Sequence, residues 1–138
     1  MLDKLKIKIA NNVIFQADYF KIGNVDELLD MREEVEFDSE WMRVYDFLNK
    51  IEIEECEQEK INDIRKNSYI MAYNLSESSD IASCVSDDFE IICKAYICDY
   101  SDGWLNALIM CYARGEFPCG QLQTLEYDVK ECINNMFN

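Results

Sequence analysis

The sequence has 138 residues, the length of one domain, and 49% of them are hydrophobic, which is enough apolar side chain to form a core. It holds 28 acidic and 13 basic residues, so the net charge is −15, and it has no histidine. A surface of this sign repels phosphate groups, which excludes nucleic acid and anionic membranes as direct partners and favours basic proteins. We expect a single globular domain over residues 1–138.

The first 20 residues fit two different structures. Lysines alternate with apolar residues from Lys4 to Ile9, as in a half-exposed strand, and Asn11-Asn12 would turn it into a second strand that ends near Tyr19. The same stretch also carries apolar residues at helical spacing, from Leu2 onward. The strict alternation favours a short β-hairpin, and a helix is the alternative.

Three helices are predicted in the next part of the chain. The first two cover residues 25–36 and 39–51 and are separated by Phe37-Asp38, with Ser39 as the N-cap of the second. A longer helix covers residues 55–75, where apolar residues recur on one face. A short capped turn over residues 80–84 then leads into the clearest signal of the sequence.

That signal is an αα-hairpin over residues 85–118. Ser86 is a good N-cap, and the two aspartates that follow it suit the first turn of a helix. The acidic segment 99–103 breaks the apolar periodicity, and a second apolar helix runs from Trp104 to Arg114, before Pro118 prevents its continuation. A last helix is expected to carry a stripe of apolar residues: Leu122, Leu125, Val129, Cys132, Ile133 and Met136. The predicted fold is mainly α, a compact bundle of about five to seven helices with a central αα-hairpin and a possible N-terminal β-hairpin.

The cysteines indicate a reduced, cytoplasmic protein. There are seven, an odd number, and the N-terminus lacks the apolar core of a secretory signal. Four of them lie on or beside apolar helical stripes, where a thiol behaves as a small hydrophobic group. No CxxC pair and no histidine are present, so we expect no zinc site, and no apolar run is long enough to predict a transmembrane helix.

Negative charge is concentrated in one part of the chain. Residues 25–60 hold 14 acids and 4 bases, a net charge of −10, whereas the other 102 residues together carry −5. The densest run covers residues 52–59, and a second acidic spot includes Asp99, Asp102 and the Asp87-Asp88 pair. Solvated helix faces are often acidic, but self-repulsion of this size costs stability and is often retained for a cationic partner. Tyr100, in the polar turn between two of these carboxylates, is expected to be an exposed anchor for protein binding.

The sequence gives no support to an enzyme. Paired carboxylates such as Asp87-Asp88 could hold Mg²⁺ or act as acid and base, but no metal-binding spacing accompanies them. The cysteines have no histidine to accept a proton, and four scattered glycines form no phosphate-binding loop. We therefore expect neither a catalytic residue nor a cofactor or metal.

The segment SDDFEIICKAYICDYSDGWLNALIMCYARGEFP, within residues 85–118, resembles the immunity proteins encoded beside bacterial polymorphic and contact-dependent inhibition toxins. The shared features are SDDF, an apolar helix, WLNAL and a terminal GEFP. The resemblance implies a cytoplasmic protein that binds one cognate toxin and blocks its active site or substrate path. Many such toxins are nucleases with basic clefts, where an acidic inhibitor presents carboxylates in place of phosphates.

The sequence thus predicts a non-enzymatic inhibitor of a basic protein, foremost a nuclease-type toxin. The alternatives are an anti-defence protein of a phage or mobile element that mimics nucleic-acid charge, a small enzyme or metal-dependent regulator, and a structural subunit that pairs with itself. The charge argument selects six contact residues: Glu52, Glu54, Glu55, Asp99, Tyr100 and Asp102.

Overall fold

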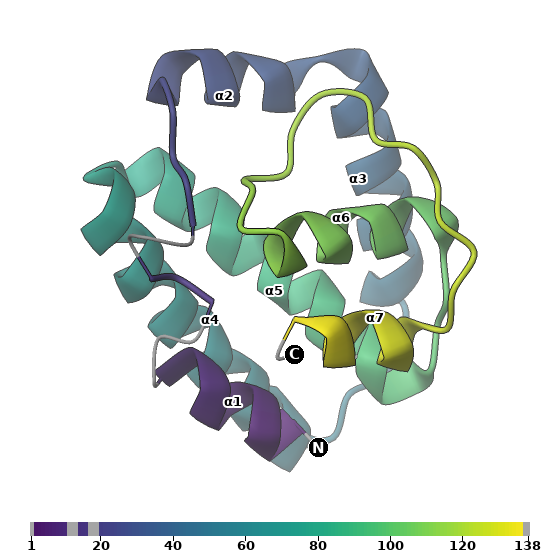
Figure 1. Ribbon diagram of the computed structural model, residues 1–138. Coiled ribbons are helices and arrows are strands. Elements are labelled where there is room, and N and C mark those ends of the chain that lie inside the picture. Colours follow the sequence, from purple (N-terminus) through teal and green to yellow (C-terminus); the bar gives the residue numbers. More distant parts are fainter. Residues whose placement is uncertain (1, 11–13, 17–19, 137–138) are drawn as a thin grey trace.

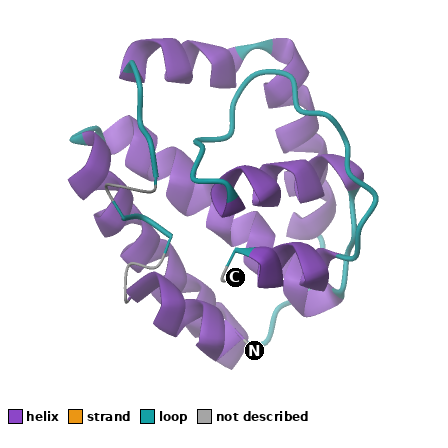
Figure 2. Cartoon of the chain, viewed as in Figure 1, coloured by secondary structure: helices purple, strands orange, loops and turns teal. Residues whose placement is uncertain are grey.

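The computed structural model describes residues 2–10, 14–16 and 20–136, which form a helical bundle without a sheet (Figures 1 and 2). This confirms the predicted fold class. Within the described residues the chain forms seven helices: α1 Leu2–Ala10, α2 Val25–Glu33, α3 Val35–Asn49, α4 Glu55–Ser76, α5 Ser79–Cys98, α6 Gly103–Ala113 and α7 Val129–Asn135. α5 runs through the centre of the bundle, and α4 is its most extensive neighbour.

The N-terminal residues are helical, so the preference for a β-hairpin was wrong over residues 2–10. Leu2, Leu5 and Ile9 share the buried face of α1, which packs against α4. Lys6 forms an ion pair with Asp63 at 2.8 Å, so the alternating lysines lie on the exposed flank of a helix. The proposed turn at residues 11–12, and part of the second strand, lie outside the described residues.

The break between α2 and α3 comes earlier than expected. Glu34 is extended (φ −62°, ψ 145°) and separates the helices, whereas Phe37 is 1% exposed and lies inside α3. Ser39 is not an N-cap, because it follows the first turn of α3 and its hydroxyl donates to the Val35 carbonyl oxygen at 2.6 Å. The result is a helix pair whose first member has no buried residue.

α4 agrees with its predicted range to within one residue, but α5 begins seven residues before the predicted cap. Ser78 is its N-cap and accepts a hydrogen bond from the Ile81 N–H at 3.2 Å. The expected turn at residues 80–84 is therefore helical, and Ser86 lies in the middle of α5. Eight of the eleven residues of α6 are buried, which confirms the central hairpin as the core of the fold.

Residues 116–128 form a strap over α6 rather than the start of the last helix, which is only α7. The side-chain amide of Asn106 donates to the Leu125 and Tyr127 carbonyl oxygens at 2.9 and 2.8 Å, so the strap's main chain is bonded to α6. Gly120, in the strap, donates its N–H to the Met31 carbonyl oxygen at 3.2 Å. Its φ is +72°, a conformation that favours glycine, and a Cβ there would lie 2.9 Å from the flexible end of the Met31 side chain.

Candidate protein-interaction surface

An uncompensated acidic surface extends over α2, α3, the loop that follows α3 and the start of α4. Twelve of the 14 carboxylates of residues 25–60 are exposed, and within the described residues only Glu40 forms an ion pair. We call the exposed set the acidic surface: Asp26, Glu27, Asp30, Glu33, Glu34, Glu36, Asp38, Asp46, Glu52, Glu54, Glu55 and Glu59.

Three of the four basic residues of the same segment are directed elsewhere, and the fourth, Lys50, is exposed at the end of α3. Arg32 extends into the protein, where its side chain is 9% exposed. Arg43 contacts Glu40 and forms two bonds, of 2.9 and 3.1 Å, to the carboxylate of Asp102 on the α5–α6 turn. Lys60 lies 3.3 Å from Asp3 of α1. These contacts leave the acidic surface largely without neutralising partners of its own.

Arg32 ends at a buried carboxylate that joins four helices. Asp88 of α5 is 0% exposed and accepts two bonds from the guanidinium of Arg32, at 2.8 and 2.9 Å. It accepts two more, from the indole N–H of Trp41 at 2.8 Å and the hydroxyl of Tyr112 at 2.6 Å. Four donors compensate the desolvation of this charge, so Asp88 is a structural group.

The surroundings of Tyr112 and Arg32 favour the neutral phenol and the charged guanidinium. Burial, followed by the charge of Asp88, raises the pKa of Tyr112 well above its ordinary value. Burial lowers the pKa of the Arg32 guanidinium, but Asp88 more than offsets this and the net pKa is raised. The phenol therefore stays neutral and the guanidinium stays charged across the physiological range. Asp88 was expected in the first turn of a helix, on an acidic spot, and that placement was wrong.

The predicted contact residues of the α3–α4 connection lie where a partner can reach them. Glu52, Glu54 and Glu55 are exposed. Glu54 precedes α4 and makes no capping bond to a main-chain N–H; its carboxylate accepts one long bond, from the Cys56 thiol at 3.8 Å. These three residues belong to the acidic surface, while Ile51, which precedes them, and Ile53, which lies between Glu52 and Glu54, pack against the core.

The predicted residues of the α5–α6 turn have different surroundings. Asp99 is exposed, with the ammonium group of Lys130 at 3.9 Å. Tyr100 was expected to be exposed, but it is half-buried, because its ring stacks on Phe47 with centroids 4.5 Å apart. Asp102 accepts from the Leu105 N–H at 3.0 Å and so caps α6, in addition to its pairing with Arg43. The Phe47–Tyr100 contact brings this turn to the end of α3, from which the chain continues to Glu52.

A recess separates α3 from the strap and has a volume of about 360 Å³. Its walls come from α3, α6 and the strap: Val35, Glu36, Ser39, Glu40, Trp104, Gln121, Leu122 and Thr124. We call it the α3 recess. Trp104 is 3% exposed, and its indole N–H has no acceptor among the described residues. A buried donor without an acceptor costs about 1–3 kcal/mol.

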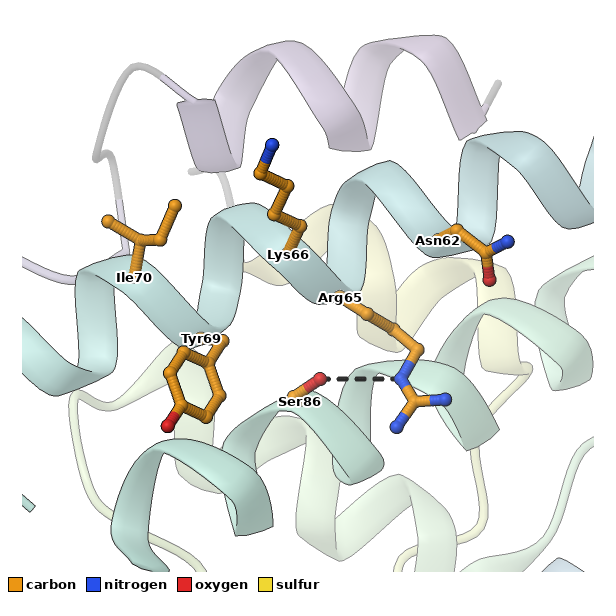
Figure 3. Close-up of a pocket in the computed structure, with 6 residues that line it drawn as sticks. All are labelled: Asn62, Arg65, Lys66, Tyr69, Ile70 and Ser86. Atoms are coloured by element: carbon orange, nitrogen blue, oxygen red, sulfur yellow. Dashed lines mark hydrogen bonds between the residues drawn. The ribbon is translucent and has the colours of Figure 1, made fainter. Parts of the chain in front are cut away.

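A second hollow, of about 510 Å³, lies between α4 and α5 (Figure 3). Arg65 reaches across it and donates to the hydroxyl of Ser86 at 3.3 Å. Its guanidinium also pairs with Asp87 at 2.7 Å and with Glu90 at 3.3 Å. Because these carboxylates neutralise Arg65, the hollow does not present this cation to an anionic ligand.

The buried thiols of Cys93 and Cys111 have the properties of structural groups. Burial raises the pKa of the Cys93 thiol far above its ordinary value, and burial raises that of Cys111 to about 11. A thiol with a raised pKa is a poor nucleophile at neutral pH.

Over residues 2–10, 14–16 and 20–136, no group of three or more potential metal-binding residues comes together. No helix in the same ranges has the length and apolar character needed to cross a membrane.

A helical bundle with an unneutralised acidic surface and buried, fully bonded internal charges has the features of a protein-binding module. A protein-family model described as Immunity protein PIM1 matches residues 4–119, which is most of the chain. The chain belongs to this family of immunity proteins. The similarity found in residues 85–118 thus extends over α1 to the start of the strap. No curated protein shows significant sequence similarity to the chain.

Proposed function

We propose that this immunity protein neutralises a basic toxin, foremost a nuclease, by placing its acidic surface on the toxin's cationic cleft. Family membership supports a role in toxin immunity. The observation that supports the electrostatic mode of binding is the near absence of ion pairs on the acidic surface. Only one of the 14 carboxylates in residues 25–60 is paired with a cation of the described chain.

The exposed, unpaired carboxylates also affect how fast the proposed complex forms. Unpaired, exposed carboxylates produce a long-range field, which accelerates association with a basic partner and is screened by salt. Paired carboxylates such as Asp88 contribute little to such a field, because an adjacent guanidinium cancels their charge. Most of the negative charge of residues 25–60 therefore lies on exposed side chains and contributes to this field.

The proposed contacts on the α3–α4 connection are Glu52, Glu54 and Glu55. On the adjoining turn we propose Asp99, with Tyr100 and Asp102 at the edge of the interface, since both already have partners within the protein. Contact with a toxin does not require these two side chains to leave their positions. The Phe47 ring, 49% exposed and stacked on Tyr100, adds an apolar element beside Tyr100.

The test uses the toxin domain encoded beside this gene, purified as an inactive variant. We expect it to bind this protein, with an association rate that falls at least about tenfold between about 50 and 500 mM salt. Co-expression of this protein with the active toxin domain should restore growth. A complex whose association rate does not change with salt would contradict the electrostatic mode, and failure to bind and protect would contradict the proposed function.

A further inference from the structure

We propose that the α3 recess receives a lysine or arginine side chain of the toxin and is the anchor of the complex. This proposal rests on the proposed function and adds the position of the main contact. It is based on the shape of the recess, the charges in its walls and the unpaired donor beside it.

The walls of the recess suit the two parts of a long cationic side chain. Glu36 and Glu40 lie one turn apart on the wall formed by α3; Glu40 is already paired with Arg43, whereas Glu36 makes no ion pair in the described part of the chain and is free for a toxin cation. Val35 at its rim is 75% exposed, the largest exposed fraction among the large apolar side chains described. Leu122 and Trp104 supply further apolar surface. An aliphatic stem can pack on these groups while the charged end meets the carboxylates.

Trp104 provides a second indication of a ligand. Its N–H is one of two buried side-chain polar groups without a hydrogen-bond partner among the described residues, and its side chain lines this recess. The other indole, of Trp41, donates to Asp88. Tryptophan and arginine are also the residues that most often dominate binding energy at protein interfaces.

The charge of the recess argues against a second copy of this chain as its occupant. Each copy carries a net charge of −15, and its exposed carboxylates would face those of the other copy. A basic toxin surface has the complementary sign. The recess is also formed before binding, because Asn106 fixes the strap through two carbonyl oxygens and the Leu125 N–H donates to the Gly103 carbonyl oxygen at 3.0 Å.

The experiment compares Glu36→Lys with Glu131→Lys. Both glutamates are exposed, lie in the first turn of a helix and make no ion pair among the described residues, and both substitutions change the net charge by the same amount. Binding of each variant to the inactive toxin domain is followed by surface plasmon resonance. We expect similar, modest losses in association rate, and a dissociation rate at least about tenfold faster for Glu36→Lys alone.

A second pair of variants tests the shape of the recess without a change in charge. Ser39→Trp fills the recess, whereas Ser79→Trp places the same side chain at an exposed serine in the first turn of α5. We expect only Ser39→Trp to speed dissociation, and thermal unfolding confirms that all four variants are folded. Wild-type binding with unchanged dissociation of Glu36→Lys and Ser39→Trp would overturn the recess proposal alone. Absence of wild-type binding would overturn the proposed function as well.

Discussion

Carboxylates in two regions of this protein have opposite surroundings. In the α5–α6 hairpin, Asp88 is fully buried and accepts bonds from three side chains that belong to three other helices. On α2 and α3, carboxylates are exposed and almost all lack a cation. The buried, paired carboxylate of Asp88 stabilises the fold and adds little to the electric field outside the protein. The exposed carboxylates of α2 and α3 add to that field and contribute little to stability. The comparison shows that the net charge of the chain says less about its function than the distribution of unpaired charge.

The largest expected effect is the loss of the buried carboxylate. Asp88→Ala leaves the guanidinium of Arg32 without its main partner in the interior, which costs about 3–5 kcal/mol in the free energy of unfolding. Urea denaturation monitored by circular dichroism measures this loss. The matched control is Asp46→Ala on the exposed side of α3, expected to change stability by less than about 0.5 kcal/mol. Similar values for the two variants would remove the distinction between the regions.

An intermediate effect on stability is expected at Asp102, because this residue caps α6 of the hairpin and is also paired with Arg43 of α3. Burial raises the pKa of this carboxyl, but the bonds from Arg43 and the Leu105 N–H outweigh burial, so its pKa lies below its ordinary value. A lowered pKa contributes stability that is present above the unfolded-state pKa and is lost as the pH falls through the folded-state pKa. Asp102→Ala should therefore cost about 1 kcal/mol at pH 7, mainly through the N-cap.

The pH dependence of the stability difference between wild type and Asp102→Ala tests whether the charged carboxylate is responsible for it. The stability gap between wild type and Asp102→Ala should stay constant from about pH 8 to pH 5 and shrink below about pH 4, near the ordinary pKa of aspartate. Asp102→Asn retains a capping oxygen but not the charge, so it should lose less than Asp102→Ala. A gap that widens on acidification would show that the carboxylate is not stabilised by these partners.

The smallest effect on stability, with a clear effect on binding, is expected at the α3–α4 connection. Replacement of Glu52, Glu54 and Glu55 by lysine should lower stability by less than about 0.5 kcal/mol per residue, because all three are exposed and unpaired. Association with the toxin domain should slow and its salt dependence should weaken. Thermal melts and binding kinetics measure the two quantities, and an unchanged association rate would remove this patch from the interface.

Local patterns predicted the elements whose signals are repeated over several turns. α4 and the α5–α6 hairpin carry long apolar stripes, and the break expected over the acidic segment 99–103 matches the turn between α5 and α6. α1 was ambiguous because the segment from Lys4 to Ile9 is too short to distinguish a period of two from one of 3.6. The strap has the apolar spacing of a helix from Leu122 onward, but it is not helical, and its main chain is bonded to α6.

Only part of the candidate site could be predicted from the sequence. Composition alone located the acidic surface, because counts of charge do not depend on contacts. The role of Asp88 did depend on contacts, although its place in the stripe Ile81, Val85, Asp88, Ile92, Ala95 was a usable signal of burial. The partners of Tyr100 and Asp102 come from α3, some 50 residues away, and no local pattern indicates them.

The attachment of α2 has a consequence for the thermodynamics of binding. This helix buries no residue of its own, yet Arg32 fixes it to α5, and the Gly120–Met31 bond fixes its last turn to the strap. The surface it carries is therefore ordered in the free protein, and the loss of conformational entropy falls on folding rather than on complex formation. A preorganised surface of this kind keeps more of its contact energy as affinity than a segment that must fold on its target.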